Sequence, residues 1–105
     1  MKHIFLKDLE LQPTQYGGRS RVLFCNPDLR VANLVLEPGE SVSSHTAPVE
    51  VVFIVLAGSG RIAAGDQEME IGEGEAVICP PGVPRSIAAA AAESLNLLVV
   101  RKGLL

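Results

Sequence analysis

The chain has 105 residues, of which 48% are hydrophobic and 20% are charged, and its formal net charge is -3. This length fits one domain, and the apolar content allows a packed core without disulfides or a structural metal. The mild acidity and the lack of a Lys/Arg cluster argue against a nucleic-acid partner. No run reaches the roughly 18 apolar residues of a membrane span, and no signal peptide is visible, so we expect a soluble cytoplasmic protein.

The chain is expected to form many short β-strands, because Gly, Pro and Asp residues interrupt its apolar runs. In chain order, strands are predicted at residues 21–25, 30–37, 41–45, 50–56, 61–64, 68–71, 76–79, 85–89 and 95–101. Turn residues at this regular spacing favour an all-β barrel or sandwich over alternating strands and helices. We expect one domain, in which an N-terminal arm with the first strands (1–29) precedes a barrel (30–105).

Local signals refine the connections between these strands. The pair Gly65-Asp66 predicts a two-residue hairpin turn, because Gly adopts positive φ without steric cost. The segment Gly58-Ser-Gly60 is expected to break the chain between two strands. The alanine run 88–92 is too short for a stable isolated helix, so it is predicted as a strand end and a hairpin.

The predicted strand at 50–56 differs from the others because it is apolar on both faces, with the sequence Val-Val-Phe-Ile-Val-Leu after Glu50. Such a strand is covered on both sides, by a second sheet or by another subunit. In a small barrel one face of this strand points into the interior. The apolar residues on its other face therefore predict contact with a second copy of the chain, in a homodimer.

Two cysteines, Cys25 and Cys79, lie in apolar runs. The simpler interpretation is a pair of reduced, buried thiols. Alternatively, one of them lines a cavity and reacts or binds a metal. No Cys-x-x-Cys motif or Cys/His cluster decides between the two interpretations.

The most informative pattern consists of two segments rich in glycine and proline. The first runs from Gly39 through His45 to Gly58, and the second runs from Gly74 through Pro80-Pro-Gly82 to Arg85. The two segments resemble the paired motifs of the cupin family, with the glycines and prolines at the expected spacings. The resemblance covers about residues 30–101 and implies a double-stranded β-helix, or jelly-roll barrel, and a homodimer.

In the cupin pattern, three histidines and one glutamate project into the barrel and hold Fe, Mn, Ni or Zn. Residue-by-residue matching retains only His45 of these four ligands. The other three positions are occupied by Ala47, Val51 and Arg85. Glu50 lies one residue early, on the opposite face of the strand, unless a β-bulge re-aims it.

Arg85 is the most telling of these replacements, because a guanidinium has no free lone pair and cannot ligate a metal. If it points inward, its charge needs a partner, which Glu50, Glu93 or a bound carboxylate or phosphate could supply. Alternatively, it points outward to solvent. His45 is either a polar ligand contact, a general base or a structural residue at a barrel mouth, which Tyr16 from a surface loop at 12–20 could cover.

Three functions are compatible with these residues. The favoured one is a metal-free module that binds a small, anionic ligand in the barrel through His45, Arg85 and Glu50. The second is a metal-dependent enzyme of dioxygenase or isomerase type, with His45 and a re-aimed Glu50 as ligands, to which Cys25 or Cys79 could be added. The third is a non-catalytic dimeric scaffold or regulatory protein with a filled barrel.

Overall fold

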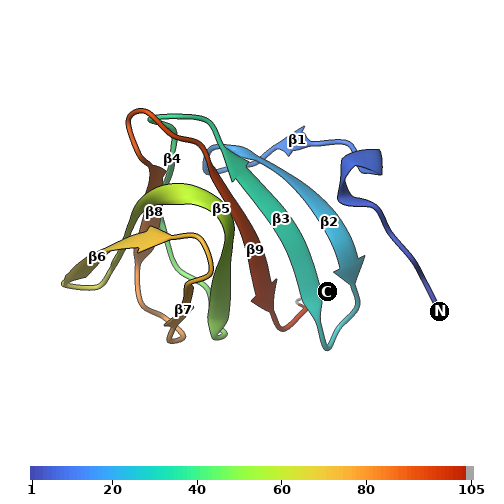
Figure 1. Ribbon diagram of the computed structural model, residues 1–105. Helices are drawn as coiled ribbons and strands as arrows, with labels where there is room; N and C mark the ends of the chain where they lie inside the picture. Colours follow the sequence, from blue (N-terminus) through green and yellow to red (C-terminus); the bar gives the residue numbers. More distant parts are fainter. Residues whose placement is uncertain (104–105) are drawn as a thin grey trace.

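Turn residues divide the chain into short strands, as the sequence predicts. The computed structural model describes residues 1–103 (Figure 1), and none of the helices in this range is long and apolar enough to cross a membrane. The elements are, in chain order, the 3-10 helix η1 (Leu6–Asp8) and the strands β1 (Gln12–Pro13), β2 (Arg19–Cys25), β3 (Arg30–Leu36), β4 (Ser41–His45), β5 (Val51–Ala64), β6 (Gln67–Gly72), β7 (Ala76–Cys79), β8 (Arg85–Ala89) and β9 (Leu95–Arg101). Residues 104–105, the last two of the predicted barrel segment, lie outside the described residues.

The strands form two antiparallel sheets that share β5. One sheet has the order β1-β2-β3-β9-β5-β7, and the other has the order β6-β5-β8-β4. Figure 1 shows β5 curving from one sheet into the other, while β9 lies between β3 and β5. The all-β prediction is therefore confirmed, and the inward side chains of both sheets meet in one interior.

The prediction that Gly58-Ser-Gly60 separates two strands is wrong, because β5 continues through these residues. The strand is bulged between Val55 and Ala57, and Gly58 adopts a φ of 87°. A Cβ atom on Gly58 would lie 1.8 Å from the carbonyl oxygen of Ser94. The glycine thus lets the strand bend against its neighbour, and a bend replaces the predicted turn.

Two other predicted connections are confirmed. Ala64 pairs with Gln67 across the turn at Gly65, whose φ is 60°. The alanine run contributes the end of β8, which stops at Ala89, and the turn that leads to β9. The predicted loop at 12–20 is the exception, since its first residues form the short strand β1, which pairs with β2.

The core lies between the two sheets, on the inward face of each strand. In β5, the alternating residues Val51, Phe53 and Val55 are buried, whereas Val52 and Ile54 between them are half-buried. The outward face of β5 is thus partly exposed in the single chain. This is the face on which the sequence predicts a partner subunit.

The two cysteines lie in different environments. Cys79, at the end of β7, is 1% exposed, whereas Cys25, at the end of β2, is exposed. The prediction that both thiols are buried is therefore wrong for Cys25. A register shift between Val22 and Phe24 changes which residues of β2 face inward, so the apolar run before Cys25 does not bury it.

Candidate functional site

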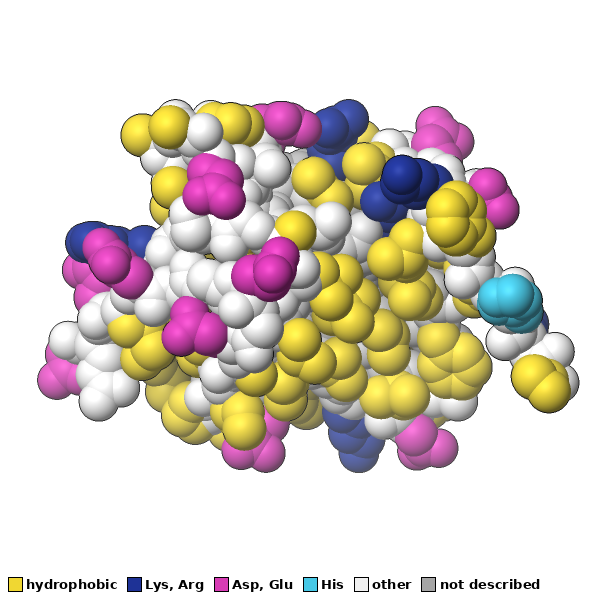
Figure 2. All heavy atoms as spheres, viewed as in Figure 1, with side chains coloured by type: hydrophobic (Ala, Val, Ile, Leu, Met, Phe, Trp, Pro, Cys, Tyr) yellow, Lys and Arg dark blue, Asp and Glu magenta, His cyan; other side chains and the backbone are white. Residues whose placement is uncertain are grey.

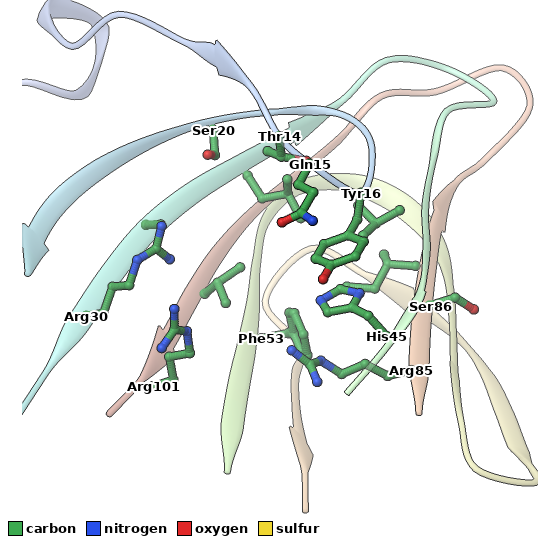
Figure 3. A pocket seen from close by; sticks show the side chains of 15 residues that line it. Thr14, Gln15, Tyr16, Ser20, Arg30, His45, Phe53, Arg85, Ser86 and Arg101 are labelled. Atoms are coloured by element: carbon green, nitrogen blue, oxygen red, sulfur yellow. The ribbon is translucent and has the colours of Figure 1, made fainter. Parts of the chain in front are cut away.

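A cavity of about 330 Å³ lies between the two sheets. Its walls combine the N-terminal loop with inward residues of both sheets, and Figure 3 shows their side chains around the open space. The polar and aromatic side chains that matter most for its chemistry are Tyr16, Arg30, His45, Phe53, Arg85 and Arg101.

Arg85 is the buried cation of this cavity. It is the first residue of β8, where Arg85, Ile87 and Ala89 alternate as buried, inward residues. Its side chain is 7% exposed, and the guanidinium carbon lies 5.7 Å from the centre of the Phe53 ring. Of the two orientations that the sequence left open, the structure shows the inward one.

No acidic residue in the described part of the chain balances this buried charge. Among residues 1–103, Arg85 takes part in no ion pair, and its buried Nε atom has no hydrogen-bond partner. Burial lowers the pKa of Arg85, and the neighbouring thiol of Cys79 opposes this effect. An arginine nonetheless stays protonated at neutral pH, so the cavity contains a fixed positive charge.

His45 faces Arg85 across the β4–β8 pair, where the two residues are direct partners in register. The Nδ1 atom of His45 lies 2.9 Å from the carbonyl oxygen of Ser43, to which it donates a hydrogen bond. The other ring nitrogen, Nε2, is therefore the one that can contact a ligand. In Figure 3 the imidazole extends from β4 toward the cavity.

Tyr16 stacks on His45 and forms part of the cavity wall. The two ring centres are 4.0 Å apart and the rings are inclined by 4°. The backbone N–H and the hydroxyl of Ser43 both donate to the carbonyl oxygen of Tyr16, at 2.9 and 3.3 Å. The predicted covering role of Tyr16 thus has a structural basis, since its loop is bonded to β4.

Glycine is required where this loop touches β4. Gly17 has a φ of 124°, and a Cβ atom there would lie 2.2 Å from the carbonyl oxygen of Ser41. Thr14 stabilises the same turn, because its Oγ1 atom accepts a hydrogen bond of 3.1 Å from the Gly17 N–H. The sequence therefore specifies the loop geometry that brings Tyr16 to His45.

Arg30 and Arg101 are site residues that the sequence analysis missed. They are partners in register, at the first position of β3 and the last position of β9, and both line the cavity. A signal for them exists, because Leu95, Leu97 and Val99 alternate along the inward face of β9, and Arg101 continues that alternation. In β3, Arg30 lies at alternate positions with the buried residues Ala32 and Leu34, so the same alternation predicts that it faces inward.

The acidic residues proposed as partners of Arg85 lie elsewhere. Glu50 is exposed immediately before β5 and does not line the cavity. Glu93 is also exposed, and it accepts a hydrogen bond of 2.9 Å from the Ser59 hydroxyl. The structure therefore brings His45 and Arg85 together and leaves Glu50 apart from them.

The architecture defines the class of protein. Two antiparallel sheets that curl around one interior form a double-stranded β-helix, the predicted fold. Residues 33–101 match the family Cupin_2, described as a cupin domain, and the chain belongs to this family. The prediction drawn from the paired motifs is thus confirmed.

Solved structures show the same fold at low sequence identity. The polyketide cyclase RemF from Streptomyces resistomycificus superposes with a TM-score of 0.88 at 23% identity, over 97% of this chain and 79% of that one. KdgF from Halomonas sp. gives 0.86 at 14% identity, over 99% and 96% of the two chains. A single-residue variant of Bacillus subtilis oxalate decarboxylase gives 0.79 at 23% identity, over 93% and 28%. The sequence matches none of the curated proteins with which it was compared.

The side chains at the cupin ligand positions do not fit a metal. Besides His45, these positions carry Ala47, which packs against the core, the fully buried Val51, and Arg85. Over residues 1–103, no group of three or more His, Cys, Asp or Glu side chains is placed to hold an ion. Two apolar side chains and a fixed cation cannot supply the oxygen, nitrogen or sulfur donors that Fe, Mn, Ni or Zn requires.

Proposed function

We propose that this protein binds a small organic anion in the cavity between its sheets, without a metal, and that Arg85 is the main contact. The observation that carries this proposal is the buried Arg85 guanidinium, whose Nε atom has no partner among the described residues. A buried cation without a counter-charge is costly. A carboxylate or phosphate would remove that cost by accepting two parallel hydrogen bonds from the guanidinium.

His45 and Tyr16 supply the remaining contacts in this proposal. With Nδ1 bonded to the Ser43 carbonyl, the Nε2 atom of His45 is available to a ligand hydroxyl or carbonyl group. The Tyr16 ring, stacked on the imidazole, provides an apolar wall. An apolar pocket with a few convergent polar groups is typical of small-molecule sites, and a volume of about 330 Å³ suits a small ligand.

The comparisons support the choice of ligand class. One structural neighbour is named oxalate decarboxylase, so a protein with this fold acts on a small carboxylate. The scaffold alternative requires a filled interior, whereas this interior contains a cavity beside His45 and Arg85. The metal-enzyme alternative requires Glu50 or a cysteine to join His45, whereas neither Glu50 nor either cysteine lines the cavity with His45.

Isothermal titration with carboxylic acids and sugar phosphates tests the proposal, using wild-type protein, Arg85→Met and Arg61→Met. We expect comparable affinities for wild type and for Arg61→Met, in which an exposed arginine is removed, and a much weaker affinity for Arg85→Met. Equal binding by all three proteins, or no binding by wild type, would contradict the proposal.

The metal-free part of the proposal has its own test. Untagged protein is incubated with Mn, Fe, Ni and Zn, desalted, and analysed by mass spectrometry. We expect far less than one metal ion per chain after desalting. A stoichiometric ion would restore the enzyme alternative.

A further inference from the structure

A second cluster of positive charge shares the cavity with Arg85. Arg30 and Arg101 extend from neighbouring positions of β3 and β9, while Arg85 extends from β8 in the other sheet. All three line the cavity, and Figure 3 shows the guanidinium groups of Arg30 and Arg101 near each other on one side and that of Arg85 beneath Phe53. The site thus presents cations from two opposing walls.

The three cations are close enough to influence one another. Burial lowers the pKa of Arg101, and the charges of Arg30 and Arg85 lower it further, while the Cys25 thiol opposes them. Like charges in a partly dehydrated space repel one another more strongly than they do in water. An anion between them would attract all three guanidinium groups and so offset this repulsion.

The described residues provide no such anion. Over residues 1–103, neither Arg30 nor Arg101 forms an ion pair, and the hydrogen bond of Arg101 goes to the backbone carbonyl of Lys102, at 3.0 Å. The remaining hydrogen-bond donors of both guanidinium groups are therefore available to a ligand. Arginine pairs of this kind suit carboxylate and phosphate groups, which accept several N–H bonds at once.

We infer that Arg30 and Arg101 form a second anion subsite, and that the ligand is a small dianion whose two ends are held by Arg85 and by this arginine pair. The inference rests on the proposed function and narrows its ligand class. Two carboxylates, or one carboxylate and one phosphate, separated by a short carbon chain meet the requirement. A monoanion would leave one wall of the cavity with uncompensated charge.

Titration calorimetry with succinate and butyrate tests the inference, because the two acids have the same carbon number and differ in their second carboxylate. Wild type should bind succinate about tenfold or more tightly than butyrate, a difference typical of one additional charge-assisted contact. Arg30→Gln and Arg101→Gln should remove most of that preference, because each should weaken succinate much more than butyrate. Arg85→Met should weaken both acids, and Lys102→Gln, a neighbouring charge outside the cavity, should weaken neither.

Nuclear magnetic resonance of the arginine side chains in wild type gives a second readout that does not depend on the folding of a variant. Succinate should shift the Nε–H signals of Arg85, Arg30 and Arg101 together, whereas butyrate should shift that of Arg85 alone. Butyrate and succinate binding with equal affinity, with Arg30 and Arg101 signals unmoved, would overturn the second subsite and leave the proposed function standing. No binding of any acid or sugar phosphate would overturn both.

Discussion

Two arginines on the outside of the barrel and three arginines in its cavity have opposite surroundings. Outside, Arg19 bonds Glu37 at 3.0 Å, and Arg61 bonds Glu68 at 2.7 Å and Glu70 at 3.4 Å. Inside, Arg30, Arg85 and Arg101 share a cavity without an acidic partner among residues 1–103. The chain has more acidic than basic residues, so this difference reflects where the acids are placed and not how many there are.

We infer from this contrast that the positive charge in the cavity binds an anionic ligand that is not part of the chain. A surface arginine with a glutamate partner contributes little to stability and needs no further explanation. A buried arginine without one reduces the stability of the empty protein, and a bound anion restores it. Stability and ligand affinity should therefore change in opposite directions when the interior charge is removed.

The largest difference between interior and exterior arginines is expected when Arg85 is replaced with methionine, which has a long, uncharged side chain. Anion affinity should fall by about 100-fold, the loss expected for a buried charge pair. The free energy of unfolding without ligand should rise by about 1–2 kcal/mol, because a costly buried charge is removed. Calorimetry and urea denaturation measure the two effects.

Arg61→Met is the matched control on the outside of the barrel. Its loss should leave anion affinity unchanged and should not stabilise the protein, because the glutamates lose their partner while remaining in solvent. A decrease in the stability of Arg85→Met, measured without ligand, would contradict the idea that Arg85 is uncompensated.

A second comparison uses two glycines with positive φ, Gly17 in the loop that carries Tyr16 and Gly39 in the turn between β3 and β4. Gly17→Ala should lower the free energy of unfolding by about 2–3 kcal/mol, because its Cβ atom would meet the Ser41 carbonyl oxygen at 2.2 Å. Gly39→Ala, with a φ of 77° and no atom within 4 Å of its Cβ, should cost only about 1 kcal/mol.

Only the Gly17 variant should also weaken anion binding, because only that loop carries the Tyr16–His45 stack. Calorimetry with both variants checks this difference. Equal effects of the two alanines on stability and affinity would show that the contact with β4 does not position the loop.

The outer face of the larger sheet offers a third comparison. It carries a row of apolar side chains, whereas the inner face of the same sheet carries Arg30 and Arg101. Register places five apolar residues side by side across five strands: Ile78, Val52, Val100, Val31 and Phe24. Ile78 is 63% exposed and Phe24 is 42% exposed. Figure 2 shows hydrophobic side chains gathered over the region of β9, β3 and β2. A contiguous apolar surface of this kind is typical of subunit contacts.

We expect this row to join two copies of the chain. In analytical ultracentrifugation, wild type should sediment as a dimer, and Ile78→Lys should raise its dissociation constant about tenfold or more. Met69→Lys, at an exposed apolar residue of β6 outside the row, is the control. A wild type that remains monomeric at high concentration would remove the dimer prediction without affecting the cavity.

A weaker effect concerns pH and the buried thiol near Arg85. Burial raises the pKa of Cys79 above its ordinary value of 9.0, although the Arg85 charge opposes this shift. Above pH 9.0 the thiol ionises more readily in the unfolded chain than in the folded one, so stability falls as pH rises. The loss from this one group is at most about 1.4 kcal/mol per pH unit.

Urea midpoints at about pH 8 and about pH 10, on either side of the ordinary thiol pKa, measure this loss in wild type and in Cys79→Ala. The alanine variant should lose less stability over this interval. Identical pH dependence of the two proteins would show that the Cys79 thiol ionises equally in both states.

Much of the fold could be predicted because it depends on local chemistry. Glycines and prolines mark the strand ends, and the boundaries of β4, β7, β8 and β9 agree with the prediction. The replacement of a cupin ligand by Arg85 was also visible, since it follows from motif spacing alone. Its inward orientation required the structure, because a side chain at a strand end can turn either way.

The rest depends on contacts between distant segments. Arg30 and Arg101 are separated by most of the barrel in sequence and meet only because β9 pairs with β3. The bend at Gly58 depends on Ser94, and the exposure of Cys25 depends on a register shift in β2. The alternation along β9 and β3 marks Arg101 and Arg30 as inward residues, but no local signal shows that they meet, that Gly58 bends against Ser94 or that β2 shifts its register.

The position of β9 has a consequence for the timing of folding. This strand lies between β3 and β5, so the larger sheet stays divided until Leu95–Arg101 becomes available. Synthesis proceeds from the N-terminus, and pairing between distant segments is slow. The apolar edges of β3 and β5 therefore stay unprotected through most of translation, which makes the nascent chain, more than the finished barrel, the form that is vulnerable to aggregation.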